Sequence, residues 1–262
     1  MSAAKLLAVA LLAGACSSAL NDPSPVAQFA PGEANGRTAA QLIAEADAAW
    51  QHRNEPGKAS QAQGLYVDAA TADARGVAGL LGAMHALSFR IEYEPGVAKA
   101  KLASEEVQLG QWCQQRAPTS PECDYRLAIA LGQEARENVS MGRDAIKHVV
   151  ELLHRAIARD PRLDEAGPHR VLSILLVRAP GWPIGPGDTD EGVAEATKAV
   201  ELAPESAANQ LVLAEALLAS GDQGKARAAY QKAATLAAVN PDKLDGARQL
   251  VEARSGLEKT GG

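Results

Sequence analysis

Histidine, cysteine and paired carboxylates carry most protein chemistry, and this chain holds few of them at useful spacing. The five histidines are His52, His85, His148, His154 and His169. None forms a His-Glu-x-x-His metal motif, and no nucleophile elbow, phosphate loop or dinucleotide fingerprint is present. The carboxylates of Glu105-Glu106 and of Asp188 and Asp190 are expected on solvated helix faces or at helix caps. The sequence therefore predicts no catalytic residue, no metal site and no cofactor, and a protein that is not an enzyme.

The first cysteine, Cys16, has a different setting. Residues 1–15 contain one charge, Lys5, and a short apolar run, which together are typical of an export signal. Small residues lead into Cys16, and this junction resembles a bacterial lipobox, which implies cleavage before Cys16 and a diacylglycerol on its thiol. The alternative is an ordinary secretory signal with an incidental cysteine. Residues 16–37 are rich in Pro, Gly and Asn and are predicted to be a flexible tether to a membrane, expected to be the outer membrane on its periplasmic side.

The other two cysteines, Cys113 and Cys123, flank a short loop between two predicted helices. Antiparallel helix ends joined by such a loop lie close enough for the Cα separation of about 4.4–6.8 Å that a disulfide needs. An exported protein also meets oxidising conditions. We therefore predict a Cys113–Cys123 disulfide, with two buried or free thiols as the alternative.

A loop at residues 179–188 holds three prolines and three glycines and cannot be helical. Trp182 carries a large apolar face and one N–H donor, so it either packs onto the helices or contacts a ligand or partner. Asp188 suits the N-cap of the next helix. Together with Arg170 upstream and Ile184 in the loop, these residues form the candidate binding loop. Trp50 and Trp112, at helical spacing among apolar neighbours, are expected in the core.

The elements that position these residues are predicted to be helices, because good helix formers dominate and aromatic residues make up 3% of the chain. Near the C-terminus, a Leu- and Ala-rich segment is followed by Gly221, then by Ala226, Tyr230 and Ala233. This resembles the helix hairpin of tetratricopeptide (TPR) repeats, with Gly at the turn and small, aromatic and small residues on the second helix. Ala62, Tyr66 and Ala69 repeat the spacing, and the step from Ala199 to Ala233 matches the TPR period.

Residues 38–257 are thus predicted to form an all-α, TPR-like solenoid of about five hairpins with a C-terminal capping helix. First helices are expected near 38–53, 76–91, 123–137, 165–179 and 205–219. Second helices are expected near 58–72, 95–117, 141–159, 189–203 and 222–237, with the final helix near 241–257. Residues 258–262 are predicted to be a disordered tail. A generic Ala-rich helical bundle is the alternative.

The fourth predicted hairpin supports a closer resemblance. A Gly-Pro pair opens its first helix, and a Pro- and Gly-rich loop ending in Gly-Asp precedes its second, which is similar to the T-component family of TRAP-type transporter systems. The matching positions are Gly167, Pro168, Arg170, Leu172, Pro180, Gly185, Gly187 and Asp188. The resemblance implies a lipoprotein with TPR-like hairpins around a central cavity, in complex with the periplasmic solute-binding protein of the transporter. Pro186 departs from the family's usual Gly-Gly-Asp run.

The formal net charge of −6 argues against a nucleic-acid partner, which requires a concentrated basic face. The favoured function is a lipid-anchored periplasmic scaffold that binds another protein; a homo-oligomer stays open. The alternative is a carrier of a small apolar molecule in a cavity between the helices. A polar groove rimmed by Arg and Glu would favour protein binding. A continuous apolar pore of Leu, Val and Ala from the first helices would favour the carrier.

Overall fold

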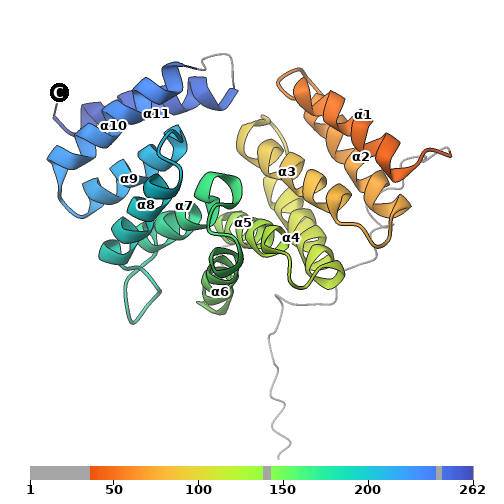
Figure 1. The fold of residues 1–262 in the computed structure, drawn as a ribbon, viewed down its shortest axis with the longest axis horizontal. Coiled ribbons are helices and arrows are strands. Elements are labelled where there is room, and N and C mark those ends of the chain that lie inside the picture. Colours follow the sequence, from red (N-terminus) through yellow and green to blue (C-terminus); the bar gives the residue numbers. More distant parts are fainter. Residues whose placement is uncertain (1–35, 138–142, 240–243, 262) are drawn as a thin grey trace, which may run out of the picture.

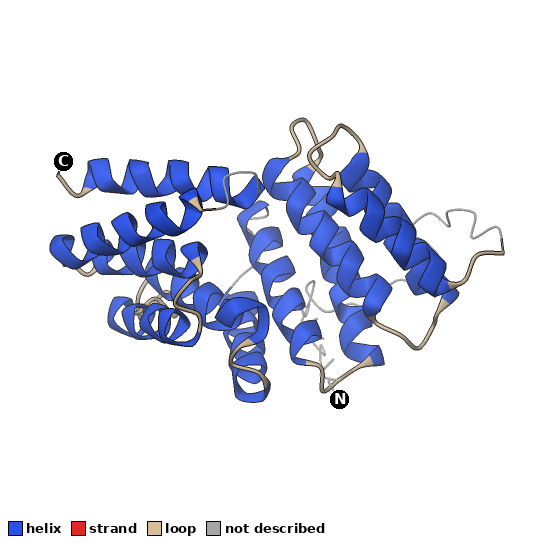
Figure 2. Ribbon diagram, turned by 45° about the horizontal axis from the view of Figure 1, so that its top comes forward, coloured by secondary structure: helices blue, strands red, loops and turns tan. Residues whose placement is uncertain are grey.

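The computed structural model describes residues 36–137, 143–239 and 244–261, in which eleven α-helices and no strand are found (Figure 2). The signal, Cys16 and the tether as far as residue 35 lie outside the described residues. The helices are α1 Ala39–Gln51, α2 Lys58–Ala72, α3 Ala78–Tyr93, α4 Lys99–Arg116, α5 Pro121–Glu137, α6 Arg143–Arg159, α7 Leu163–Arg178, α8 Thr189–Leu202, α9 Ala207–Ala219, α10 Gln223–Ala238 and α11 Leu244–Lys259.

Each helix packs against the next one along the chain, so that the helices form successive antiparallel hairpins arranged as an arch (Figure 1). Each odd-numbered helix also contacts the next odd-numbered helix, from α1 to α11. The odd helices therefore form a continuous inner row, and the even helices lie outside it. This arrangement confirms the predicted TPR-like solenoid and is not that of a bundle around a single central core.

Small residues and tyrosines hold the stack together as the repeat pattern predicts. Ala62 and Ala226 on second helices are fully buried, and the tyrosine four residues after each is also buried. Tyr66 packs against Gly82 of the next helix, and Tyr230 packs against Gly256 of α11. The same Tyr-on-Gly contact thus occurs in the first and last parts of the solenoid. Each tyrosine fills the space between one hairpin and the following helix.

The helix boundaries follow local chemistry. Gly221 adopts a φ of +88° at the α9–α10 turn, and the Asp222 carboxylate then accepts a hydrogen bond from the Lys225 backbone N–H. Two of the differences from the sequence prediction have a clear physical cause. Helix α4 begins four residues later than expected, because Gly96 adopts a φ of +75° in the preceding turn.

The second difference lies at the C-terminal end. Helix α11 continues to Lys259, and Arg227 donates a hydrogen bond of 2.9 Å to the Gly261 carbonyl. Residues 258 and 259 therefore belong to the final helix, and the turn at residues 260–261 docks against α10, which corrects the prediction of a disordered tail from residue 258. The added turn extends the helical pattern because its carbonyls have partners.

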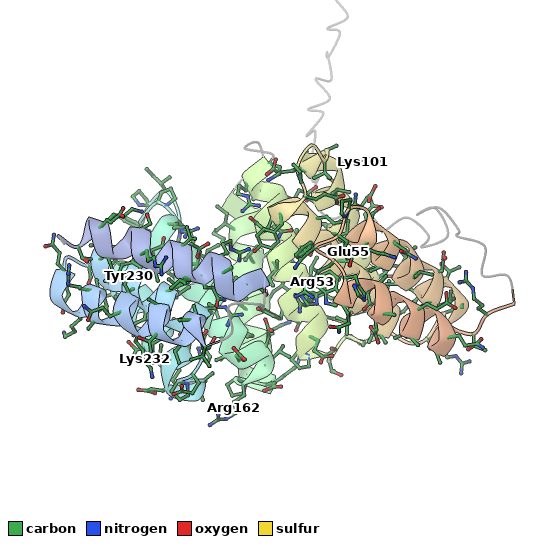
Figure 3. All side chains as sticks on the ribbon, turned by 90° about the horizontal axis from the view of Figure 1, so that it is seen from above. Arg53, Glu55, Lys101, Arg162, Tyr230 and Lys232 are labelled. Atoms are coloured by element: carbon green, nitrogen blue, oxygen red, sulfur yellow. A yellow bond between two sulfur atoms is a disulfide. The ribbon has the colours of Figure 1, made fainter. Side chains whose placement is uncertain are left out.

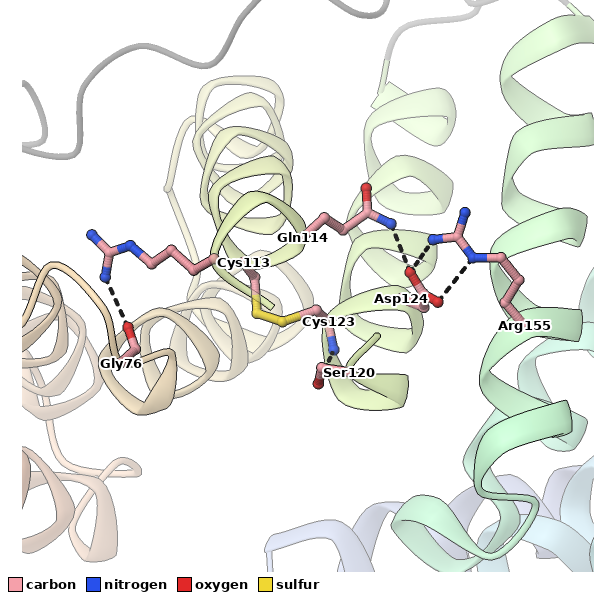
Figure 4. Close-up of a disulfide and its surroundings, with 8 residues drawn as sticks. Gly76, Cys113, Gln114, Ser120, Cys123, Asp124 and Arg155 are labelled. Carbon is pink, nitrogen blue, oxygen red and sulfur yellow. Dashed lines mark hydrogen bonds and ion pairs between the residues drawn. A yellow bond between two sulfur atoms is a disulfide. The ribbon is translucent and has the colours of Figure 1, made fainter. Parts of the chain in front are cut away.

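A disulfide joins the end of α4 to the start of α5 (Figure 4). The Cα atoms of Cys113 and Cys123 lie 5.3 Å apart, and both side chains are fully buried. The next residue, Asp124, accepts hydrogen bonds from Gln114 of α4 and from Arg155 and Arg159 of α6. The buried carboxylate of Asp124 and the disulfide together link the second and third hairpins.

The α2–α3 contact provides a direct test of close helix approach. A Cβ placed on Gly79 would lie 2.5 Å from the Ala70 backbone nitrogen and 2.6 Å from the Tyr66 carbonyl oxygen. We expect Gly79→Ala to lower the free energy of unfolding by about 1–3 kcal/mol, because backbone atoms cannot yield as a flexible side chain would. Urea denaturation followed by circular dichroism measures the change.

The matched control is Gly64→Ala in α2, where an added Cβ would have no atom of another group within 4 Å. This substitution should raise the free energy of unfolding by about 1 kcal/mol, because alanine is the better helix former. Equal effects of the two substitutions would show that the α2–α3 spacing does not require a glycine.

Candidate functional site

The inner row of helices lines a central cavity of about 340 Å³. Its walls come from α1, α3, α5, α7, α9 and the start of α11, which are all odd-numbered helices. Seen from above, Arg53 lies near the middle of the molecule, where the first hairpin faces the last helix (Figure 3). The cavity therefore occupies the concave side of the arch, between the two ends of the solenoid.

Arginines and aromatic rings pack together on one wall. The Arg53 guanidinium lies 4.9 Å from the centroid of the Trp50 ring and 5.8 Å from that of Phe89. The Arg248 guanidinium lies 4.0 Å from the centroid of the Tyr93 ring. Because Arg248 belongs to α11 and Tyr93 to α3, this cation–π contact joins the two ends of the arch across the cavity.

The charges that line the cavity are predominantly basic. Arginines come from four elements: Arg53, Arg126, Arg170 and Arg248. The acidic side chains are Glu92 and Asp245, and Glu92 is engaged by Arg136 at 2.6 Å. A basic cavity in a chain of net charge −6 concentrates positive potential where the walls exclude water.

His85 stands between these arginines and the aromatic wall. Its ring lies 4.7 Å from that of Trp50, and its side chain faces the cavity. Desolvation by the surrounding protein atoms, with the positive charge of Arg126, lowers the pKa of His85 to about 4. The imidazole is therefore uncharged at neutral pH and can both donate and accept a hydrogen bond.

Behind the cavity wall, Glu106 of α4 is 0% exposed. This corrects the expectation that Glu105-Glu106 lies on a solvated helix face. The hydroxyl of Ser88, which lines the cavity, donates a 2.6 Å hydrogen bond to Glu106 Oε1, and Oε2 has no partner among the described residues. Desolvation raises the pKa of Glu106 to about 8, so the carboxyl is protonated at neutral pH.

Arg170, one of the predicted loop residues, lies in the cavity and holds a turn. Three consecutive residues before Gly167, from Asp164 to Ala166, have φ values of 49°, 55° and 62°. Arg170 pairs with the Asp164 carboxylate at 3.2 Å and donates to Asn209 at 2.9 Å. Helix α7 proper therefore begins at the Gly-Pro pair, as its sequence suggests, after a left-handed turn that the sequence pattern did not reveal.

The other predicted loop residues lie elsewhere. Trp182 is 90% exposed and Ile184 60% exposed, so neither packs onto the helices. Asp188 caps α8 by accepting a hydrogen bond from the Glu191 backbone N–H, and its own N–H bonds to the Leu176 carbonyl at the end of α7. Arg170 lies six residues before Leu176, which is about 9 Å along the axis of α7. The structure thus does not bring the four candidate residues together as one site.

Sequence reasoning also missed residues that the cavity brings together. Trp50 does pack on the core, as expected, but it also faces the cavity. Arg126 and Arg248 occupy helix positions that are typical of ordinary solvated charge. The available signal was Arg126 itself, which stands between Tyr125 and Leu127 on a first helix, in a row of helices that must face inward.

Two further features bear on the type of site. Among the described residues, no three His, Cys, Asp or Glu side chains gather closely enough to hold a metal ion. Within the same part of the chain, every helix is too short or too polar to cross a membrane.

No protein-family model matches this sequence, and no curated protein does. The structure is similar to solved TPR structures, which places it in the class of TPR-type helical solenoids. One is TTC0263, a thermophilic TPR protein in Thermus thermophilus, with 18% identity and a TM-score of 0.63 over 82% of this chain and 98% of that chain. The structure is also similar to that of yeast Tom70, with 18% identity and a TM-score of 0.50 over 84% of this chain and 41% of that chain. At these identities the likeness shows the fold alone.

The buried carboxyl of Glu106 predicts a measurable pH dependence of stability. Its folded-state pKa of about 8 exceeds the ordinary value of 4.5, so the protonated group favours the folded state. This contribution is complete below pH 4.5 and is lost as the pH rises towards 8, at up to about 1.4 kcal/mol per pH unit. Glu106→Gln should therefore lose less stability than the wild type between pH 5 and 8.5 in urea unfolding.

The partly exposed neighbour provides the control, since Glu105→Gln should keep the pH dependence of the wild type. The titration of His85 is common to all three proteins and cancels in the comparison. If Glu106→Gln and the wild type lose stability in parallel, Glu106 is ionised in the folded protein at neutral pH.

Proposed function

We propose that this protein is a lipid-anchored periplasmic scaffold whose concave face binds another protein. The observation that supports this most is the central cavity, where arginines and aromatic rings from the inner row of helices line one concave surface. Arg, Trp and Tyr are the residues that most often contribute binding energy at protein interfaces. Stacked hairpins present such a concave surface to a peptide or a helix.

The lining of the cavity favours protein binding over the alternative of an apolar carrier. The cavity is bordered by Arg53, Arg126 and Glu92 together with Phe89 and Tyr93, and not by a continuous pore of Leu, Val and Ala. A small apolar ligand would have to desolvate several charged groups without pairing them. A protein segment with both polar and apolar side chains meets the same wall without that cost.

The anchor and the partner in this proposal are based on the sequence. The lipobox-like junction at Cys16 supports a diacylglycerol anchor in the outer membrane, and residues 17–37 are long enough to hold the solenoid about 25 Å from the bilayer. The fourth hairpin supports a TRAP-type partner, because Gly167-Pro168 opens the helical part of α7 and Asp188 caps α8. The partner that we propose is the solute-binding protein of a TRAP-type transporter.

Acylation of Cys16 can be measured directly. In a bacterial host, the wild type should incorporate an alkynyl palmitate label and sediment with membranes, whereas Cys16→Ser should do neither. The double variant Cys113→Ser, Cys123→Ser is the control and should still be labelled. Label on Cys16→Ser, or an unlabelled wild type, would remove the anchor from the proposal.

Capture from detergent-solubilised membranes tests the partner and the surface together. The wild type should recover a TRAP-type solute-binding protein, identified by mass spectrometry. Arg126→Glu should reduce that recovery at least tenfold, because it reverses a charge in the cavity, whereas Trp182→Ala should leave it unchanged. Loss with Trp182→Ala alone would make the exposed loop the recognition element. Absence of any solute-binding protein from the wild-type capture would contradict the TRAP assignment.

A further inference from the structure

The cationic groups of the central cavity are not all engaged within the protein. Arg170 is occupied by Asp164 and Asn209, and Glu92 is occupied by Arg136. Among the residues that the structure describes, Arg53 and Arg126 have no carboxylate partner within ion-pair distance. Asp245 is likewise unpaired there, so that two guanidinium groups without a carboxylate partner share the cavity with one unpaired carboxylate. Of the two, Arg53 donates a hydrogen bond of 3.2 Å to the Trp50 carbonyl. The unpaired positive charges of the cavity therefore exceed the unpaired negative ones, so a ligand could add a negative charge there.

Arg248 adds a second, independent observation. Its Nε donates to Glu252 at 3.2 Å, and its guanidinium is fixed over the Tyr93 ring. Its Nη1 is buried and has no hydrogen-bond partner in the described structure. A buried guanidinium N–H without an acceptor costs free energy that an incoming carboxylate oxygen would recover.

An apolar surface continues from this basic centre to the edge of the arch. The rings of Trp50 and Phe89 meet edge to face at 5.3 Å, and those of Phe89 and Tyr93 at 5.0 Å. A second cavity of about 370 Å³ shares Arg53, Phe89 and Tyr93 with the first and extends to Pro56 and Pro95. A ligand that spans both cavities therefore meets positive charge first and aromatic or proline surface next.

We propose that this continuous surface binds a peptide segment of the protein partner in which a carboxylate is followed by an aromatic or aliphatic side chain. The carboxylate lies between Arg126 of α5 and Arg248 of α11, and the apolar side chain lies on Phe89 and Tyr93. This inference rests on the proposed scaffold function and specifies the chemistry of what the concave face recognises. The terminal helix α11 is thereby part of the binding site as well as a cap, since it supplies Arg248.

The test uses capped, fluorescently labelled hexapeptides and the purified mature chain. A peptide of alternating Glu and Phe should bind, as measured by fluorescence anisotropy. Peptides of alternating Gln and Phe, or Glu and Ala, should bind at least tenfold more weakly. A Gln and Phe peptide with a free C-terminal carboxylate distinguishes a terminal source of the charge from a side-chain source; recovery of binding there also supports the carboxylate site.

Single substitutions test where on the protein the peptide binds. Arg126→Gln and Arg248→Gln should each weaken binding of the Glu and Phe peptide at least tenfold. Arg254→Glu, an exposed arginine on the same helix as Arg248, should leave binding unchanged. Circular dichroism confirms that each variant is folded, and Arg126→Lys, which keeps the charge, should retain part of the affinity if Arg126→Gln proves unstable.

The outcomes separate this inference from the proposed function. If the wild type captures its protein partner but binds the Glu and Phe peptide no better than the Gln and Phe peptide, the proposed chemistry is wrong and the scaffold function stands. If the Glu and Phe peptide binds equally well to Arg126→Gln, Arg248→Gln and the wild type, the site is elsewhere. If the peptide binds as proposed but no protein is captured from membranes, the scaffold function fails and the anion site stands.

Discussion

The close approach of successive hairpins is the constraint on which the rest of this structure depends. Where Gly79 faces Ala70, even one methyl group would overlap backbone atoms of the neighbouring helix. Tyrosines such as Tyr66 and Tyr230 then fill the spaces that remain between hairpins. Because small residues let successive hairpins approach closely and tyrosines fill the space that remains, the hairpins stack in one direction. A curved inner row, and hence a concave surface, follows from that stacking.

The last helix converts this concave surface into a cavity. A solenoid of hairpins alone would leave the inner row open along its length. Here α11 packs on α9 and α10, and its first turns reach α3, where Arg248 lies on Tyr93. The contact brings charges from α11 opposite those of α1 and α5, which are far away in the sequence. Closure thus places Arg126, His85 and Asp245 around one cavity, in which burial and the positive charge of Arg126 lower the pKa of His85.

The helices could be predicted from the sequence because their causes are local. The structural roles of Ala62 with Tyr66, and of Gly221 with Asp222, can be recognised from a few neighbouring residues. The predicted helix ranges agree with the observed ones apart from particular ends. The cavity could not be predicted in the same way. Whether Arg248 reaches Tyr93 depends on the summed curvature of every hairpin between them, and Glu106 is buried only because α3 and α5 cover it.

The exposed loop shows that the sequence can also single out residues that do not belong to the cavity. Trp182 attracts attention because its type and its Pro- and Gly-rich surroundings are unusual within the sequence, whereas Arg126 sits in an ordinary helical pattern. Only the arrangement of the helices shows that Arg126 shares a cavity with other arginines, while Trp182 faces solvent. A segment of unusual composition shows that its own backbone is restricted. A site that is made from several hairpins need not contain such a segment.

The left-handed turn before α7 shows how the fold divides its arginines between structure and recognition. Three successive residues with positive φ, none of them glycine, cost about 1–3 kcal/mol each, and such a turn persists only where its surroundings hold it. Tyr125 donates to Asp164 at 2.7 Å, and Asn209 donates to the Glu165 carbonyl at 2.8 Å. Arg170 completes this clamp.

The clamp fixes where α7 begins, and therefore how the third hairpin meets the fourth beneath the cavity. Arg170 is consequently committed to internal acceptors in that turn and in α9, whereas Arg126, one inner helix earlier, has no carboxylate partner among the described residues. Two arginines that line the same cavity thus have different roles: Arg170 stabilises the bend of the arch, and Arg126 stays available to a ligand.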